Sequence, residues 1–378
     1  VSLHFNQGLG YAVSSDTMNA ANGLNGASYL LSIDSSGRIL TCGSRLNSLN
    51  RREPIIHRFL PTGALDPSFN NGRGLVIVNE ESAGIDGTSN ATKWELCYGI
   101  TTDPSDDSFY TLIYHSPGGM ANQTAVMKFK SSGAIDTSYG TSGYYIPPAS
   151  IGGAVNGNVL VGIYLNPTTR SILASGETMG TGGWEPLMLK LTSAGVLDAT
   201  YGTGGYSIFQ HEADGPGGVV NATKDAMTTN SLLPVDASGN AYWVGRDKDA
   251  AGGGTGYAIA VVKFKADGSV DTTYGNMGAT GAFLYNPGGV GPTGGAAAGK
   301  VEWSQAAKLD SQGRLVIVGS TNNGGVTGEF TLYRITSAGQ IDKAQELFAQ
   351  AQTAHPDLAL EYARSLEKGK KYAEALKI

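Results

Sequence analysis

The sequence is short of the residues on which most metal, nucleic-acid and cofactor sites depend. Only 2 of its 378 residues are cysteine and 5 are histidine, 15% are charged, and the formal net charge is −6. Two cysteines cannot form a four-cysteine zinc site, and the histidines show no HExxH spacing. The missing basic surplus argues against a nucleic-acid partner. We therefore predict no cofactor; a structural Ca²⁺ ion stays open, although "DKDAAGGG" lacks the carboxylate pattern of a calcium loop.

Long apolar runs are also missing. No stretch reaches the roughly 18 consecutive apolar residues of a membrane-spanning helix, so no span is predicted. The chain opens "VSLHFNQGLG", without the basic and then apolar segments of a signal peptide. Cys42 and Cys97 both lie in strand-like apolar runs, "ILTCGS" and "WELCYGI". We expect two buried free thiols there, and a disulfide between them stays open.

Glycine, in contrast, is abundant, at 55 residues, and much of it recurs in one phrase. "GAIDTSYGTSGYYI" at 133–146 returns as "GVLDATYGTGGYSI" at 195–208, and shorter versions occur elsewhere. Aligned on their aspartates, five copies lie 62 to 73 residues apart. A period of this length indicates a repeat architecture.

Each copy is surrounded by the same series of strand signals. A strand, a tight polar turn such as "DSSGR" and a second strand come first, followed by an alternating strand such as "AVMKFK". The repeated phrase then forms a turn into a short fourth strand such as "GYYI". Four-stranded repeats of this length are typical of β-propeller blades.

The last repeat lacks its fourth strand, because the sequence turns helical after Asp342. Residues 5–14 read as the missing strand, with Phe5 in the aromatic position and Ser2 where the aspartate would stand. A first strand that completes the last blade would leave no open sheet edge. We therefore predict an all-β fold: a five-bladed β-propeller of four-stranded blades over residues 1–342, closed by its N-terminal strand.

A cation stands eight residues before each repeated aspartate. This constant register predicts an ion pair that braces the turn in every blade, and an anion-binding ring is the alternative. The five pairs of this structural frame are Arg58 and Asp66, Lys128 and Asp136, Lys190 and Asp198, Lys263 and Asp271, and Arg334 and Asp342.

The phrases "KFKSSGAIDTSYGTSG" and "KLTSAGVLDATYGTGG" resemble the delta-60 repeat family of bacterial proteins. "RFLPTGALDPSFNNGRG" fits as well, with Asn70 where glycine is usual. The resemblance covers about residues 1–342. It implies a β-propeller, often part of a large secreted or cell-surface protein, and it implies no activity, since the shared residues are the structural frame.

Residues 343–378 have a different composition, with apolar residues at helical spacing interrupted by Pro356 and Asp357. We expect an α-helical hairpin. Its positions Ala344, Phe348 and Ala351 weakly resemble a tetratricopeptide repeat, although Gly369 and Tyr372 depart from that spacing. The tail reads as a docking or homo-oligomerising element, as the start of a truncated helical array, or as an appendage that is not native.

Because antiparallel strands alternate in direction, the loops fall on two ends of the propeller. The turns after the first and third strands are short and uniform, whereas the other loops are long, polar and different in every blade. Variable loops on a uniform scaffold typically form a binding surface, and indoles beside carboxylates and ammonium groups suit sugars. The candidate ligand-binding residues at this end are Lys93, Trp94, Glu95, Lys224, Asp225, Lys300, Glu302 and Trp303, followed by Trp184, His115 and Tyr257, which we expect on the loops between the second and third strands.

These residues favour a non-catalytic recognition module that binds glycan or surface polysaccharide, and the resemblance implies that it belongs to a bacterial secreted or cell-surface protein. One alternative is a glycoside hydrolase, which needs two facing carboxylates. These could come from Glu95, Asp225 and Glu302 near the axis, or from Glu177, Glu212 and Asp247 on loops. The other is a structural propeller that binds a protein partner. The aromatic residues are open to a purely structural interpretation too, as packing between blades, and Trp243 in "AYWVG" is expected in the core.

Overall fold

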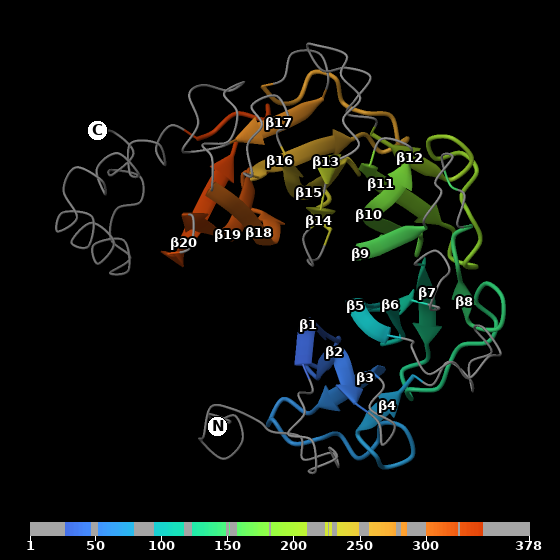
Figure 1. The fold of residues 1–378 in the computed structure, drawn as a ribbon. Helices are drawn as coiled ribbons and strands as arrows, with labels where there is room; N and C mark the ends of the chain where they lie inside the picture. Colours follow the sequence, from blue (N-terminus) through green and yellow to red (C-terminus); the bar gives the residue numbers. More distant parts are fainter. Residues whose placement is uncertain are drawn as a thin grey trace.

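The computed structural model contains strands and turns, without a helix, in the part of the chain that it describes (Figure 1). The described residues are 27–46, 52–78, 94–116, 123–148, 151, 157–180, 183–209, 224–225, 227–228, 233–248, 257–276, 281–285, 300–323 and 326–342. The predicted N-terminal strand at 5–14 and the predicted helical tail at 343–378 lie outside these ranges.

The strands form consecutive antiparallel meanders, which we number in chain order. Meander 1 contains β1 (Ala27–Ile33), β2 (Ile39–Leu46), β3 (Arg52–Phe59) and β4 (Leu75–Ile77). Meander 2 contains β5 (Trp94–Thr102), β6 (Phe109–Ser116), β7 (Gln123–Phe129) and β8 (Tyr144–Tyr145). Meander 3 contains β9 (Asn158–Leu165), β10 (Ile172–Gly180), β11 (Gly183–Leu191) and β12 (Tyr206–Ile208).

Meander 4 begins with the short strands β13 (Lys224–Asp225) and β14 (Met227–Thr228) and continues with β15 (Ala241–Lys248), β16 (Tyr257–Phe264) and β17 (Ala282–Tyr285). Meander 5 contains β18 (Lys300–Leu309), β19 (Leu315–Asn323) and β20 (Val326–Ile335). Among the described residues, meander 5 has three strands, whereas the fourth strands β4, β8, β12 and β17 pair with β3, β7, β11 and β16. The four strands predicted for each of the first four repeats are confirmed.

The meanders follow one another along an arc in Figure 1. Their first strands, β1, β5, β9, β14 and β18, lie on the inside of the arc, and the fourth strands lie on its outside. Short parallel pairings connect the third strand of one meander to the first strand of the next, as between β3 and β5 and between β16 and β18. The ends of the described arc are therefore β1 and the strands of meander 5.

The turn between the first two strands of a meander is held by an acidic or amide side chain. In meander 1, the Asp34 carboxylate accepts hydrogen bonds from the backbone N–H groups of Ser36 and Arg38, at 3.0 and 2.9 Å. Asp103, Asn166, Asp236 and Asp310 accept equivalent bonds in the other four meanders. The side chain thus closes the turn locally, as aspartate and asparagine commonly do.

The apolar core lies between neighbouring meanders. Each of four buried clusters combines residues of one meander with residues of the next; in the first, Ile56 and Phe69 of meander 1 pack with Ile100, Phe109 and Phe129 of meander 2. The other clusters join meanders 2 and 3, 3 and 4, and 4 and 5. Trp243, expected in the core, is 1% exposed.

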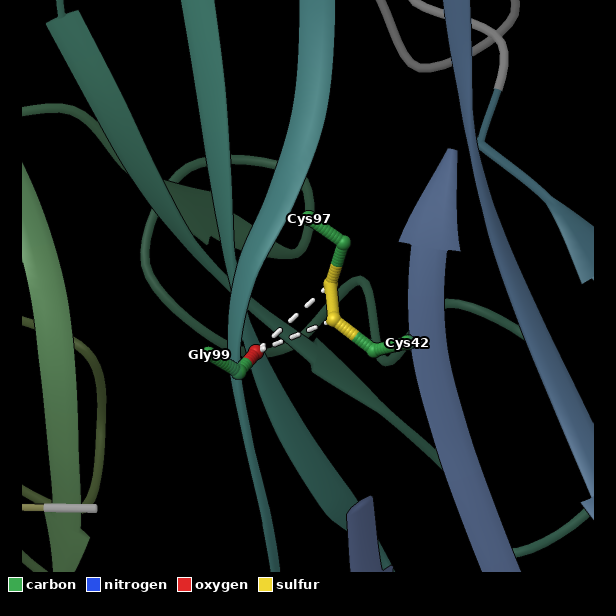
Figure 2. Close-up of a disulfide and its surroundings, with 3 residues drawn as sticks. All are labelled: Cys42, Cys97 and Gly99. Atoms are coloured by element: carbon green, nitrogen blue, oxygen red, sulfur yellow. Dashed lines mark hydrogen bonds between the residues drawn. A yellow bond between two sulfur atoms is a disulfide. The ribbon is translucent and has the colours of Figure 1, made fainter. Parts of the chain in front are cut away.

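Cys42 and Cys97 form a disulfide between β2 and β5, so the expectation of two free thiols is wrong (Figure 2). The Cα atoms are 5.7 Å apart, and both sulfurs lie 3.6 Å from the carbonyl oxygen of Gly99. The cysteines face each other because β5 begins the next meander and packs against β2. The bridge is a covalent link between two adjacent meanders.

Candidate functional site

The five frame pairs form at the end of the meanders that carries the uniform turns. The cation–carboxylate distances are 2.8 Å for Arg58 and Asp66, 3.0 Å for the two pairs of meanders 2 and 3, 3.1 Å for Lys263 and Asp271, and 2.8 Å for Arg334 and Asp342. Each cation lies on the third strand and reaches the turn that leads to the fourth. The predicted brace is therefore present, with the charge of each cation already balanced by a carboxylate.

Hydrogen bonds favour the ionised form of two of these aspartates, Asp136 and Asp198. The Ser138 hydroxyl donates to Asp136 at 2.6 Å, and this bond, together with Lys128, lowers the pKa of the carboxyl. In meander 3 the Thr200 hydroxyl, at 2.6 Å, and Lys190 do the same for Asp198. Donors that favour the charged form stabilise it against protonation.

The frame turn also connects each meander to the next. The backbone N–H four residues after the frame aspartate donates to a carbonyl oxygen four residues before the next one. The four bonds run from Asn70 to Ser132 at 2.8 Å, Gly140 to Ala194 at 2.8 Å, Gly202 to Asp267 at 2.7 Å and Gly275 to Ala338 at 3.1 Å. These bonds connect neighbouring meanders at the uniform end and hold them in register.

The aromatic residue of each frame turn is part of the same interface. Phe69, Tyr139, Tyr201 and Tyr274 are at most 2% exposed, and burial raises the pKa of all three tyrosines. The Lys190 ammonium lies 5.6 Å from the Tyr201 ring centroid, within cation–π range. A phenol held neutral and buried between meanders contributes to packing.

The opposite end, with the variable loops, brings candidate residues of different meanders together. Parallel pairing there places Arg52 of β3 beside Trp94 of β5, Trp184 of β11 beside Asp225 of β13, and Tyr257 of β16 beside Val301 of β18. We call these three places the inter-meander junctions. Each one combines an aromatic residue of the candidate set with charged residues on the same or the adjoining strand.

The candidates occupy the following places. Trp94 and Glu95 begin β5, Lys224 and Asp225 form β13, and Lys300, Glu302 and Trp303 belong to β18. Trp184 and Tyr257 were expected on loops and instead lie in strands: Trp184 is half-buried in β11, and Tyr257 begins β16. Lys93 lies outside the described residues.

His115 was expected on a loop and instead lies in β6, where its side chain is 5% exposed. It is directly opposite Glu95 of β5 in the antiparallel register. Glu177, also expected on a loop, lies in β10 and is 9% exposed. The second strands extend further toward the variable end than their sequences indicate, because polar residues there are covered by the neighbouring strands.

Two arginines at this end were not singled out from the sequence. Arg52 lies at the first junction and donates to the Ser44 hydroxyl at 3.2 Å. Arg246 of β15 is 7% exposed although it carries a charge. Their positions in the repeat could have pointed to both arginines. Arg52 begins a third strand, where a junction forms, and Arg246 lies near the end of a second strand. Within the described residues no group of three or more metal-ligating side chains gathers.

The sequence matches a family model described as "Domain of unknown function (DUF5122) beta-propeller" over residues 35–69 and 249–274. Both segments contain a frame turn, in meanders 1 and 4. No curated protein matches the sequence. Together with the consecutive four-stranded meanders, this family match identifies the fold as a β-propeller.

Solved structures to which the chain is similar include a protein of unknown function from Dyadobacter fermentans, with 11% identity, 65% of this chain and 67% of that chain covered, and a TM-score of 0.39. The GH93 α-L-arabinofuranosidase of Fusarium graminearum shows 9% identity, coverage of 83% and 82%, and a TM-score of 0.42. The α-L-arabinanase of Cellvibrio cellulosa shows 9% identity, coverage of 84% and 96%, and a TM-score of 0.38.

Among the residues that the structure describes, no helix is long and apolar enough to cross a membrane.

Proposed function

We propose that this protein is a non-catalytic recognition module that binds glycan or surface polysaccharide at the variable-loop end of a five-bladed β-propeller. The fifth blade is meander 5, completed by the strand at residues 5–14. The ligand lies across the inter-meander junctions, and the uniform end serves as scaffold.

The observation that carries this proposal is the register at the junctions. It puts an aromatic residue next to charged residues of the neighbouring meander, as with Trp184 and Asp225. An aromatic face packs against the apolar face of a sugar ring, while carboxylate and ammonium groups bond its hydroxyls. The junctions recur around the arc, which suits a polymer with a repeating unit.

The disulfide supports an extracellular location. A bond such as Cys42–Cys97 forms and persists in oxidising environments and is rare in the cytosol. We therefore place the module outside the cell, in a secreted or cell-surface protein of a bacterium, where surface polysaccharides are available.

The test is retention on a panel of immobilised bacterial and host polysaccharides, with new reducing ends measured in the same samples. We expect retention without cleavage, reduced at least tenfold by Trp184→Ala, by Trp94→Ala or by Trp303→Ala. Arg73→Ala, which changes an exposed residue of a uniform turn, is the matched control and should leave retention unchanged.

Two outcomes would replace the proposal. New reducing ends that disappear in Glu95→Gln or Glu302→Gln would make the protein a glycoside hydrolase. No retention on any polysaccharide, from a protein that is folded by circular dichroism, would favour a propeller that binds a protein partner.

A further inference from the structure

The inter-meander junctions form at three boundaries and are absent from a fourth, among the described residues. We name the three by their meanders. Junctions 1/2, 3/4 and 4/5 are the pairings of Arg52 with Trp94, of Trp184 with Asp225 and of Tyr257 with Val301. Each third-strand member stands six positions before the frame cation of its meander. Between meanders 2 and 3, the described parts of β7 and β9 form no such backbone pairing.

The positions that would form this missing junction carry no aromatic residue. Thr178 and His115 each pair with the residue five places before the frame cation of their meander, and Asn158 is opposite Thr178 as Glu95 is opposite His115. Gly157 therefore stands where junction 1/2 has its tryptophan. It is buried, with a φ of +100° that suits glycine. The third-strand position, six residues before the cation, is an asparagine outside the described residues.

The segment that connects meander 2 to meander 3 covers this boundary at the variable end. Three side chains, from β7, β9 and β10, donate hydrogen bonds to its carbonyl oxygens. The bonds run from Gln123 to Pro147 at 3.1 Å, from Asn158 to Pro148 at 2.6 Å and from Thr178 to Ile151 at 3.4 Å. Asn158 and Thr178 are 0% and 1% exposed beneath the segment. The surface here is therefore formed by the segment, whose described residues carry neither an aromatic ring nor a charge.

A side chain also takes the place of the backbone pairing at this boundary. The Thr124 hydroxyl of β7 accepts a hydrogen bond from the Leu160 N–H of β9 at 3.0 Å, and Thr124 is 0% exposed. The equivalent positions in meanders 1 and 3, four residues before the frame cation, are Pro54 and Pro186. Meanders 2 and 3 are thus joined by a buried contact and covered above it.

We infer that the variable end carries two separate glycan-binding areas. Area A is junction 1/2, and area B comprises junctions 3/4 and 4/5, on the two sides of meander 4. The covered boundary between meanders 2 and 3 lies between A and B along the arc (Figure 1).

This inference rests on the proposed function and specifies its ligand. The ligand is a polysaccharide long enough to reach both areas, bound at two places with uncontacted sugars between them. Two linked contacts raise the affinity for such a polymer above that of either area alone, on the order of 10²–10⁴-fold where the chain spans both.

The test is titration calorimetry of the full chain with oligosaccharides too short to reach from Trp94 to Trp184. They are prepared by partial acid hydrolysis of the polysaccharide that the panel retains. We expect two oligosaccharides to bind per chain. Trp94→Ala should leave one, with the affinity of the remaining area unchanged, and the double variant Trp184→Ala/Tyr257→Ala should also leave one. Arg73→Ala, the control at the uniform end, should keep both.

Two further measurements do not depend on counting sites. Binding of the oligosaccharides should slow amide hydrogen exchange in the peptides that contain Trp94, Asp225 and Val301, and should leave exchange between Ile151 and Asn158 unchanged. The intact polysaccharide should bind the wild type more tightly than the oligosaccharides do, and should lose this advantage in Trp94→Ala.

The outcomes separate this inference from the proposed function. Any number of oligosaccharides other than two, or slower exchange that extends through Ile151 to Asn158, would overturn the division while the recognition module stands. So would loss of both sites in Trp94→Ala, in a protein that is folded by circular dichroism, or a polymer advantage that survives this substitution. If no polysaccharide is retained at all, the proposed function fails and the division fails with it.

Discussion

The frame aspartate Asp136 makes two stabilising interactions, a hydrogen bond and an ion pair. The Asp136 carboxylate accepts from the Ser138 hydroxyl and pairs with Lys128 at 3.0 Å. Its side chain is 15% exposed, so the pair is only partly screened by water. A charge-assisted hydrogen bond at such a site contributes about 1.5–3 kcal/mol.

We expect Asp136→Asn to reduce the free energy of unfolding by about 1–2 kcal/mol at pH 7, because the amide keeps the shape but loses the charge. The pKa of Asp136 is lowered in the folded state. The contribution is therefore fully present above the unfolded pKa of about 4 and is lost as pH falls through the lower folded pKa. Urea unfolding between pH 7 and pH 2.5 should show the difference between variant and wild type disappearing toward acid.

A difference that persists unchanged at pH 2.5 would show that the substitution acts through packing and not through charge. Lys130→Ala is the control, since Lys130 is exposed and follows the same strand. It should have no effect on stability at either pH.

At the scale of the turn, Gly195 at the start of a frame phrase is a position that only glycine fits without strain. Its φ is +78°, and a Cβ there would lie 2.6 Å from the Gly140 nitrogen and 2.9 Å from the Tyr139 ring of the preceding meander. The position combines a left-handed backbone with close approach of two meanders. Gly204, by contrast, has a φ of +66° and nothing within 4 Å of a Cβ.

These two glycines separate backbone strain from packing. Gly204→Ala should cost only the left-handed conformation, about 1–2 kcal/mol. Gly195→Ala should cost the same plus about 1–3 kcal/mol for forcing the meanders apart. Equal losses in chemical denaturation would show that the turn yields without disturbing the interface.

The strands of the first four repeats and all five frame pairs could be predicted from the sequence, because they depend on local spacing that recurs. Contacts between meanders could not. The disulfide depends on which strand packs against β2, and the pairing of Trp184 with Asp225 depends on two segments about 40 residues apart in sequence meeting at a junction. His115 was expected on a loop because its neighbours are polar, yet β5 and β7 on either side bury it in the sheet.

For the molecule as a whole, the described residues of meander 5 form three strands, β18, β19 and β20, and this leads to a prediction about residues 5–14. In the other meanders the third strand is paired on its outer side, as β3 is by β4. The sequence "FNQGLGYAV" at 5–13 parallels "FNNGRGLVI" at 69–77, the frame turn and fourth strand of meander 1. Residues 5–14 are thus expected to pair with β20 in the same register.

Deleting residues 1–14 should therefore lower the Tm and promote association, because an unpaired outer strand edge is a template for other chains. Deleting residues 343–378, which follow the last frame aspartate, is the matched control and should leave the Tm of the propeller unchanged. Differential scanning calorimetry with light scattering measures both effects. An unchanged Tm for the first deletion would mean that β20 does not depend on the N-terminus. Loss of stability in the control alone would instead make the C-terminal segment the element that covers meander 5.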